Sequence, residues 1–248
     1  MRLLTTIAAV CAALLSAPAL AQDPIAQSVE AIANYDTDGA LTVLDAACKA
    51  GSGEACWRAA LIQSNEFSDE AKAAAGKQFL ANCAKGDARS CYMMGKAVEY
   101  DAPAKDKARA RTAIGKACDG GLAFACSEFA DMLVDENFGT VDEAAALSAR
   151  QKACDGNYAK DCHSAGETIY YAADGNAAKL DRALALEKKG CELGNGESCA
   201  GLVTIELSRI ESPGQADVVR WQGWRKRACE LGETYQCQEW LSQTYVVP

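Results

Sequence analysis

Twelve of the thirteen cysteines fall into six pairs with one internal spacing, which limits the possible folds of this 248-residue chain more than any other feature. Seven residues separate the two cysteines of every pair, and successive pairs begin 35 to 38 residues apart. The pairs are Cys48/Cys56, Cys83/Cys91, Cys118/Cys126, Cys154/Cys162, Cys191/Cys199 and Cys229/Cys237. Twelve cysteines allow roughly ten thousand pairings in principle, but six copies of one spacing favour a disulfide within each pair.

A bridge within each pair requires the chain to reverse direction between the two cysteines. Residues eight apart on one helix are separated by about 12 Å of rise, whereas bridged cysteines need Cα atoms within about 7 Å. Three residues after each first cysteine stands a residue that accepts the left-handed conformation ending a helix. These residues are Gly51, Gly86, Gly121, Asn157, Gly194 and Gly232. The pattern predicts six helical hairpins, in which the first cysteine closes one helix and the second lies early in the next.

A period of about 36 residues built from two helices predicts a solenoid, because a single hairpin cannot bury its own apolar face. Eight residues before each first cysteine stands an alanine, with one exception, and small side chains at a fixed register indicate close helix packing. The residues are Ala40, Ala75, Ala110, Ala146, Ala183 and, as the exception, Trp221. We expect an all-α, α/α solenoid of about thirteen helices, the first near residues 24–34 and the last near residues 233–245.

Residues 1–21 have the pattern of a secretory signal peptide. Arg2 is followed by an apolar stretch, and Ala19-Leu20-Ala21 forms a small-x-small cleavage site. We expect a mature chain of residues 22–248 that is periplasmic or secreted, where disulfides persist. A lipid anchor on Cys11 is the alternative, and the residues before Cys11 fit it poorly. No later stretch has the roughly 18 uninterrupted apolar residues of a membrane helix, so no membrane span is predicted.

Composition argues against several classes of function. The chain has 25 Lys and Arg against 34 Asp and Glu, a formal net charge of −9, and therefore lacks the positive surface that nucleic acids and anionic lipids attract. A single histidine with bridged cysteines cannot supply a zinc site. No serine is followed by lysine in the S-x-x-K pattern of serine β-lactamases, since Ser68 and Lys72 miss it by one residue. We predict no catalytic residue, metal or cofactor, no nucleic-acid partner, and a monomeric chain.

Two short motifs have both a functional and a structural interpretation. Cys162-His163 lacks the earlier cysteine of a haem attachment motif, so His163 is interpreted as a residue on a helix surface. The segment from Asp36 to Gly39 resembles the start of a calcium loop, but Ala47 stands where the last ligand is required. A turn with a helix cap is predicted there instead.

The repeat resembles the Sel1-like repeat, a relative of the tetratricopeptide repeat. Residues 116–133 (KACDGGLAFACSEFADML) and 188–202 (KKGCELGNGESCAGL) resemble the disulfide-rich secreted branch of that family, which includes the Helicobacter cysteine-rich proteins. The resemblance covers about residues 23–245 and implies a right-handed superhelix that acts as a non-catalytic protein-interaction scaffold. Some members of this branch bind penicillin-like compounds or carry a β-lactamase label. A β-lactamase-like hydrolase, or a binder of penicillin or cell-wall compounds, is therefore the alternative.

In the geometry that this resemblance implies, the helix bearing each second cysteine lines the concave surface. Residues two or five positions after that cysteine are then expected to contact a protein or peptide partner: Arg58, Lys96, Asp131, Glu167 and Thr204. The run RWQGWRKR at residues 220–227 adds two tryptophans with two interpretations. Trp221 and Trp224 either cover the end of the solenoid or form a basic, aromatic contact site.

Overall fold

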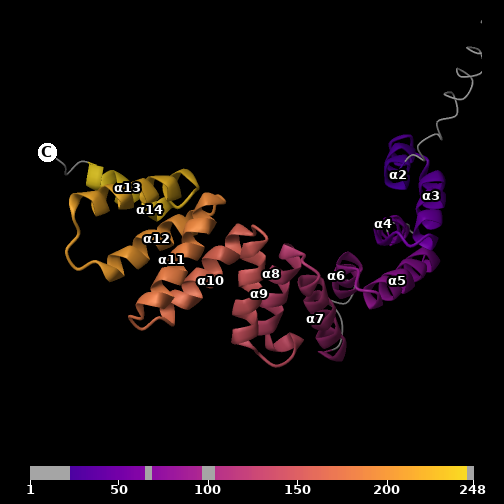
Figure 1. Cartoon of the computed structure of the whole chain (residues 1–248), viewed down its shortest axis with the longest axis horizontal. Helices are drawn as coiled ribbons and strands as arrows, with labels where there is room; N and C mark the ends of the chain where they lie inside the picture. The colour runs from indigo at the N-terminus through magenta and orange to yellow at the C-terminus, as the bar shows by residue number, and fades with distance from the viewer. Residues whose placement is uncertain (1–22, 65–68, 97–103, 245–248) are drawn as a thin grey trace, which may run out of the picture. The chain divides into compact units, whose positions relative to one another are not determined.

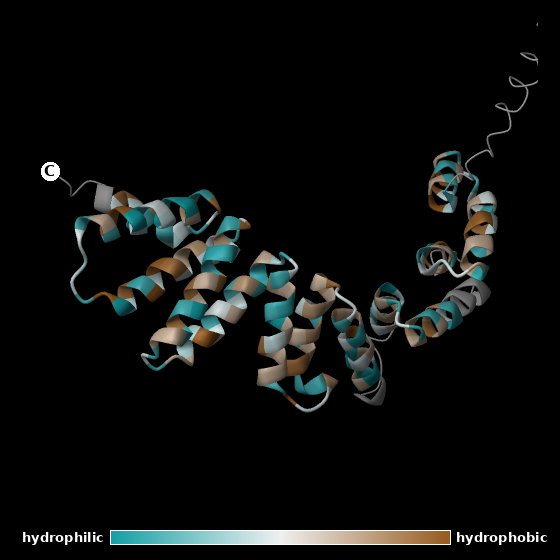
Figure 2. Cartoon of the chain, in the orientation of Figure 1, coloured by the Kyte–Doolittle hydropathy of each residue, from teal (hydrophilic) through white to brown (hydrophobic). Residues whose placement is uncertain are grey.

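A computed structural model describes residues 23–64, 69–96 and 104–244, and all regular structure in these residues is helical (Figure 1). The helices mix hydrophobic and hydrophilic residues along their length, as expected of helices that bury one face (Figure 2). None of the described helices is long and apolar enough to cross a membrane. The predicted signal peptide, with Cys11, lies outside the described residues.

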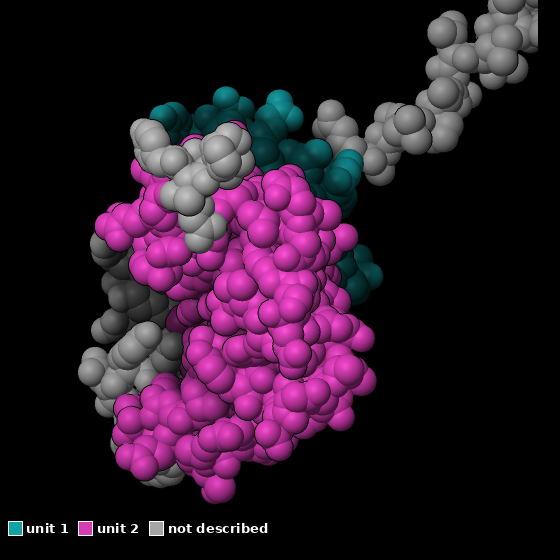
Figure 3. Space-filling model, turned by 90° about the vertical axis from the view of Figure 1, so that its left-hand side faces the viewer, with its two compact units in different colours: residues 1–82 teal, residues 83–248 magenta. Residues whose placement is uncertain are grey.

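The chain divides into two compact units, residues 1–82 and 83–248 (Figure 3). The helices of the first unit are α2 (Pro24–Ala33), α3 (Thr37–Lys49) and α4 (Gly53–Ser64), and α5 (Asp69–Ala84) crosses the boundary in sequence. The second unit contains α6 (Ala88–Lys96), α7 (Ala104–Asp119), α8 (Ala123–Val134), the 3-10 turn η1 (Glu136–Phe138), α9 (Glu143–Asp155), α10 (Ala159–Tyr171), α11 (Ala177–Glu192), α12 (Gly196–Arg209), α13 (Gln215–Glu230) and α14 (Thr234–Thr244). Thirteen α-helices in the described residues agree with the expected number, and the first and last lie where the sequence predicts them.

The six predicted disulfides are confirmed, and each joins the end of one helix to the start of the next. They are Cys48–Cys56, Cys83–Cys91, Cys118–Cys126, Cys154–Cys162, Cys191–Cys199 and Cys229–Cys237. The Cα atoms of bridged cysteines lie between 4.4 Å, for Cys118 and Cys126, and 4.7 Å, for Cys191 and Cys199. The chain therefore reverses within seven residues at every hairpin. Closing a loop of this size is expected to stabilise the fold by about 2.5 kcal/mol per bridge in the chain-entropy model.

The second cysteine of each pair lies early in its helix, as predicted, but the bridges differ in burial. Cys56 in α4 is 6% exposed and Cys91 in α6 is 1% exposed, whereas Cys237 in α14 is only half-buried. All three lie 4.6 Å from their partners between Cα atoms. Since α14 is the last described helix, no following helix covers the bridge of Cys237 within the described part of the chain.

The chain reverses at the predicted turn residues. All six have a positive φ, from 68° at Asn157 to 105° at Gly232. At the α11–α12 corner the amide of Gly194 donates to the carbonyl of Cys191 at 3.1 Å, and Asn195 donates to Gly190 at 2.9 Å. These bonds satisfy carbonyls at the helix end, as in other left-handed helix caps. The first cysteine of each pair consequently sits in the last turn before a cap of defined geometry.

In the first unit, a small apolar core lies between α2, α3 and α4. Leu44, Ala55 and Ala59 are buried there, with Ile25 packed against them. Asp36 is the N-cap of α3 and its carboxylate accepts a hydrogen bond from the amide of Gly39 at 2.9 Å. The predicted turn with a helix cap is confirmed at this position.

In the second unit, helices that follow one another in sequence lie side by side from α6 to α14 (Figure 1). The repeated alanine register is buried: Ala110, Ala146 and Ala183 are at most 2% exposed, as is Ala40 in the first unit, whereas the side chain of Ala75 lies outside the described residues. One core cluster lies between α6, α7 and α8 around Ile114, and another lies around Leu202 and the Cys191–Cys199 bridge. Core packing therefore repeats along this unit, as a solenoid requires.

Candidate functional site

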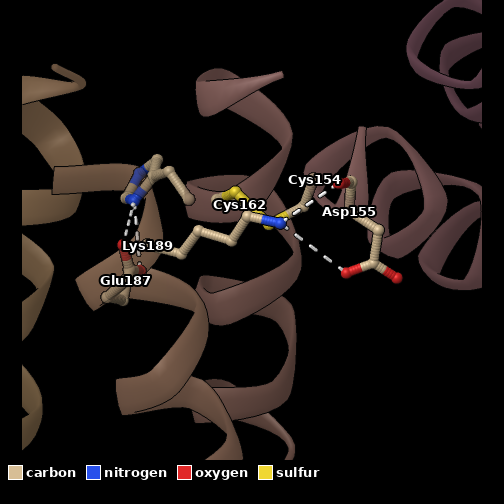
Figure 4. Close-up of a disulfide and its surroundings, with 6 residues drawn as sticks. Cys154, Asp155, Cys162, Glu187 and Lys189 are labelled. Atoms are coloured by element: carbon tan, nitrogen blue, oxygen red, sulfur yellow. Dashed lines mark hydrogen bonds and ion pairs between the residues drawn. A yellow bond between two sulfur atoms is a disulfide. The ribbon is translucent and has the colours of Figure 1, made fainter. Parts of the chain in front are cut away.

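The candidate site lies where α10, α11 and α12 pack against one another. The Cys154–Cys162 disulfide holds the start of α10 to the end of α9, and the Cys191–Cys199 disulfide holds α12 to α11. Beside the first bridge, Lys189 of α11 reaches back to Asp155, with Nζ 3.3 Å from its carbonyl oxygen and 3.8 Å from Oδ1 of its carboxylate (Figure 4). These contacts fix the three helices at the level of Glu187, two residues earlier on α11.

A buried carboxylate and the only histidine of the chain form the floor of the site. Glu187 is 1% exposed, and both of its carboxylate oxygens lie close to Nδ1 of His163, at 3.2 and 3.1 Å. The side chain of His163 is 18% exposed. The interpretation of His163 as a residue on a helix surface is therefore wrong, because its ring is drawn inward by a buried acid.

Two glycines make room for the Glu187 carboxylate. A Cβ on Gly166 of α10 would lie 3.0 Å from its carboxyl carbon, and a Cβ on Gly201 of α12 would lie 2.7 Å from the same atom. Real side chains do not approach so closely without displacement, so a larger residue at either position would move the carboxylate. The pair of glycines thus sets the place of the acid between the two flanking helices.

Burial and mutual charge shift the proton affinities of both partners. Burial alone lowers the pKa of His163, but its hydrogen bond to Glu187, the charge of that carboxylate, and the charges of Glu197 and Glu167 together raise it above the ordinary value. Burial raises the pKa of Glu187, although the hydrogen bond and charge of His163 act in the opposite direction. The pair therefore retains a proton to a higher pH than an ordinary histidine does.

A pocket of about 200 Å³, open to solvent, lies over this pair. Four carboxylates line it, from Glu167 on α10, Glu187 on α11, Glu197 on α12 and Glu233 just before α14. The remaining lining residues are His163, Tyr170, Tyr171, Ala200, Gly201, Thr204 and Ile205. Four acids against one histidine make the pocket strongly acidic at neutral pH.

The bridged cysteines support the pocket and do not line it. The lining residues include no cysteine, although the bridges at Cys162 and Cys199 hold the helices that form its walls. The bridges of Cys56, Cys91 and Cys237 join other pairs of helices, α3 to α4, α5 to α6 and α13 to α14. All twelve cysteines therefore have the structural role that the sequence predicts.

Of the seven predicted contact residues, the structure brings two into this pocket, Glu167 and Thr204. Both stand five positions after a second cysteine, in successive repeats, as the sequence predicts for one continuous face. The other predicted polar residues lie elsewhere and pair with acids or bases on their own or a neighbouring helix. The pairs are Arg58 with Glu54 at 2.7 Å, Lys96 with Glu128 at 3.3 Å, and Asp131 with Arg150 at 3.5 Å.

The two tryptophans belong to the packing of the last repeats. Trp221 is 4% exposed and donates its indole N–H to Glu206 at 3.3 Å, so its side chain cannot form part of a contact surface. Trp224 packs against the core cluster around Leu202, and the guanidinium of Arg220 lies 5.6 Å from the centre of its ring. Of the two interpretations, the capping role fits these positions, and the assignment of Trp221 to a binding face is wrong.

His163 and Glu187, which the sequence prediction missed as site residues, could have been found by comparing equivalent positions in the six repeats. Four residues before the first cysteine, the first three repeats have the apolar residues Leu44, Phe79 and Ile114, and the last three have Arg150, Glu187 and Arg225. The apolar three are all at most 5% exposed. A charged residue at a core register requires a partner, and the single histidine, one position after Cys162, is the obvious candidate.

Comparison with solved structures places this fold among Sel1-repeat proteins. A Sel1 repeat protein from Oxalobacter formigenes is similar with a TM-score of 0.60 and 18% sequence identity, over 88% of this chain and 86% of that one. A protective antigen of uropathogenic Escherichia coli strains, which has an SLR fold, is similar with a TM-score of 0.61 and 16% identity, over 86% of this chain but only 46% of that one. No protein-family model and no curated protein matches the sequence. The likeness establishes a helical repeat fold of the Sel1 type.

Proposed function

We propose that this chain is an exported, non-catalytic scaffold that binds a protein or peptide through the second helices of its repeats. The observation that carries the proposal is the open pocket between α10 and α12, which places Glu167 and Thr204 from successive repeats on one surface. Repeat proteins of this kind commonly use such surfaces to bind other proteins. The Sel1-type fold supports the same class of function.

The six disulfides support export to the periplasm or beyond. Structural disulfides persist in oxidising compartments and are rare in the cytosol of most organisms. Six bridges of one spacing, each joining the helices of one hairpin, are also in keeping with the disulfide-rich secreted branch of the Sel1-like family. The predicted signal peptide over residues 1–21 supplies the route.

The chemistry of the pocket supports binding rather than hydrolysis. The residues that line it include no serine, cysteine or lysine. The hydroxyl of Thr204 donates to the carbonyl of Ala200 at 3.3 Å, which leaves it turned toward its own helix. An acyl-transfer enzyme needs a nucleophile within hydrogen-bonding reach of a base, and among the described residues no hydroxyl that lines this pocket is hydrogen-bonded to His163 or to a carboxylate.

Co-purification under non-reducing conditions tests the proposal. The mature chain, residues 22–248, is immobilised with its disulfides intact and exposed to an envelope extract. We expect a specific partner to be retained by the native chain, and not by a reduced and alkylated sample or a Glu167→Ala/Thr204→Ala variant. A Glu143→Ala/Thr140→Ala variant, changed at exposed positions outside the pocket, is the matched control. Retention that is equal on all four samples would contradict the proposal.

A chromogenic cephalosporin tests the enzymatic alternative on the same preparation. We expect no turnover above that of the reduced and alkylated sample. Turnover well above that level, lost on reduction, would replace the scaffold by a β-lactamase-like hydrolase.

A further inference from the structure

We infer that the pocket over Glu187 receives a cationic side chain, an arginine or a lysine, of a bound peptide. The inference deepens the proposed function and rests on it, because it names the group that the scaffold recognises. It starts from the cavity itself, which is open to solvent and bounded by residues from α10, α11, α12 and the start of α14.

Three of the pocket acids have no cation of their own. No ion pair or side-chain hydrogen bond involves Glu167, Glu197 or Glu233 within the part of the chain that the structure describes. Several acids elsewhere in the same unit are paired with a cation, for example Glu128 with Lys96 and Glu206 with Arg220. The pocket therefore gathers carboxylates that the chain leaves unbalanced, and an incoming cation would balance them.

Glu187 adds a buried negative charge at the floor of the cavity. Its only cationic partner among the described residues is His163, which is uncharged once it loses its proton. A carboxylate that is 1% exposed is costly to leave without a compensating charge. A guanidinium or ammonium group above the floor would supply that charge.

The wall of the pocket suits the flat or extended shape of such a group. Tyr170 and Tyr171 contribute two rings whose centres lie 5.3 Å apart, and Tyr171 is 75% exposed. Tyrosine faces attract cations, and the aliphatic stem of arginine or lysine packs on apolar surface. Ala200, Gly201 and Ile205 provide that surface.

Peptide titration followed by NMR tests the inference on the ¹⁵N-labelled mature chain. The probes are acetyl-Ala-Arg-Ala-amide, acetyl-Ala-Lys-Ala-amide and acetyl-Ala-citrulline-Ala-amide, whose citrulline has nearly the shape of arginine without its charge. We expect the arginine or the lysine peptide to shift the amide signals of Ala200, Gly201 and Thr204, and the citrulline peptide to leave them in place. A response to one cationic peptide alone identifies which cation the pocket takes. Equal shifts with all three peptides, or none with either cationic peptide, would overturn the inference.

A charge-matched pair of variants separates the pocket from the general acidity of the chain. Glu167→Gln/Glu197→Gln/Glu233→Gln is expected to weaken binding of the cationic peptide about tenfold or more. Glu136→Gln/Glu192→Gln/Glu211→Gln removes the same number of charges at exposed positions of the same unit and should leave Kd nearly unchanged. Equal weakening in both variants would mean that only the net charge matters. If the cationic peptides fail to bind while a partner is still retained in the co-purification, the pocket inference falls and the scaffold proposal stands.

Discussion

Gly95 and Gly166 occupy the same position in two repeats, four residues after the second cysteine, yet they face chemically different side chains. A Cβ on Gly95 would lie 2.4 Å from Cδ1 of Ile114, and a Cβ on Gly166 would lie 3.0 Å from the carboxyl carbon of Glu187. Ile114 and Glu187 each stand four residues before the next first cysteine. Equivalent positions therefore hold an apolar side chain in one repeat and a buried acid in the other.

The difference shows which part of the repeat is structural and which part can change. The hairpins that follow these residues are bridged alike, with Cα atoms 4.4 Å apart at Cys118 and 4.7 Å apart at Cys191. The residue after the preceding second cysteine changes together with the buried one. It is Tyr92 opposite Ile114, with its hydroxyl donating to Glu128 at 2.8 Å, and it is His163 opposite Glu187. The bridged turn therefore fixes the backbone of the repeat, whereas this pair of positions decides whether the contact is apolar or charged.

The largest effect is expected from placing an acid in the apolar repeat. Ile114→Glu puts a carboxylate at a position that is 0% exposed and has a tyrosine where the other repeat has its histidine. We expect a loss of about 4 kcal/mol in the free energy of unfolding, because Tyr92, unlike a histidine, cannot take up a proton to compensate the buried charge. Urea denaturation followed by circular dichroism measures it. Ile114→Leu is the control, with an expected cost below about 1.5 kcal/mol. A loss no larger than that of the control would show that the position of Ile114 tolerates an acid as well as the position of Glu187 does.

Removal of the histidine partner is expected to have the next largest effect. His163→Ala leaves Glu187 buried without its cationic partner, and we expect a loss of about 3 kcal/mol at pH 8. The loss should shrink as the pH is lowered, because the raised pKa of Glu187 lets the carboxyl take up a proton. Tryptophan fluorescence during denaturation reports on this end of the chain through Trp221, Trp224 and Trp240. Tyr92→Phe, at the equivalent position, serves as the control and should show no such pH dependence. A loss independent of pH would point to packing alone.

This comparison also shows what the sequence could and could not predict. The disulfides, the turn residues and the helix count follow from spacing, because a bridge eight residues apart and a left-handed turn admit few backbones. The pocket depends on which side chains from α10, α11 and α12 meet. Glu167 and Thr204 could be placed on one face from the repeat period, whereas the contact of His163 with Glu187 joins positions 24 residues apart that no motif links. The two interpretations of Trp221 stay open in the sequence, because a basic, aromatic composition does not reveal that its indole is buried and donates to Glu206.

A smaller effect is expected from pH acting on the unmodified chain. The pKa of both His163 and Glu187 is raised in the folded state. A group whose pKa is raised on folding stabilises the fold at pH values below its pKa in the unfolded chain. That stabilisation is lost as the pH rises through the pKa of the group in the folded state. We therefore expect the second unit to lose stability as the pH rises from about 4.5, the ordinary pKa of the acid, and through the region above 6.5, that of histidine. Comparison with Glu187→Gln isolates the pair from other groups, since that variant should show a flatter profile. Identical profiles would mean that the pair does not set the pH dependence.

The smallest change in stability is expected from replacing His163 and Glu187 by the residues at the equivalent positions of the apolar repeat. His163→Tyr/Glu187→Ile reproduces Tyr92 and Ile114 at their equivalent positions, and a buried ion pair replaced by apolar residues often leaves stability unchanged or raises it. We expect an unfolding free energy within about 1 kcal/mol of the native chain at neutral pH, and no pH dependence from this corner. Denaturation at several pH values checks both points, with the single Glu187→Ile variant as the control. A double variant that is several kcal/mol less stable than the native chain would mean that the pair of His163 and Glu187 is required for folding. A double variant as stable as the native chain implies that the acid is retained for binding.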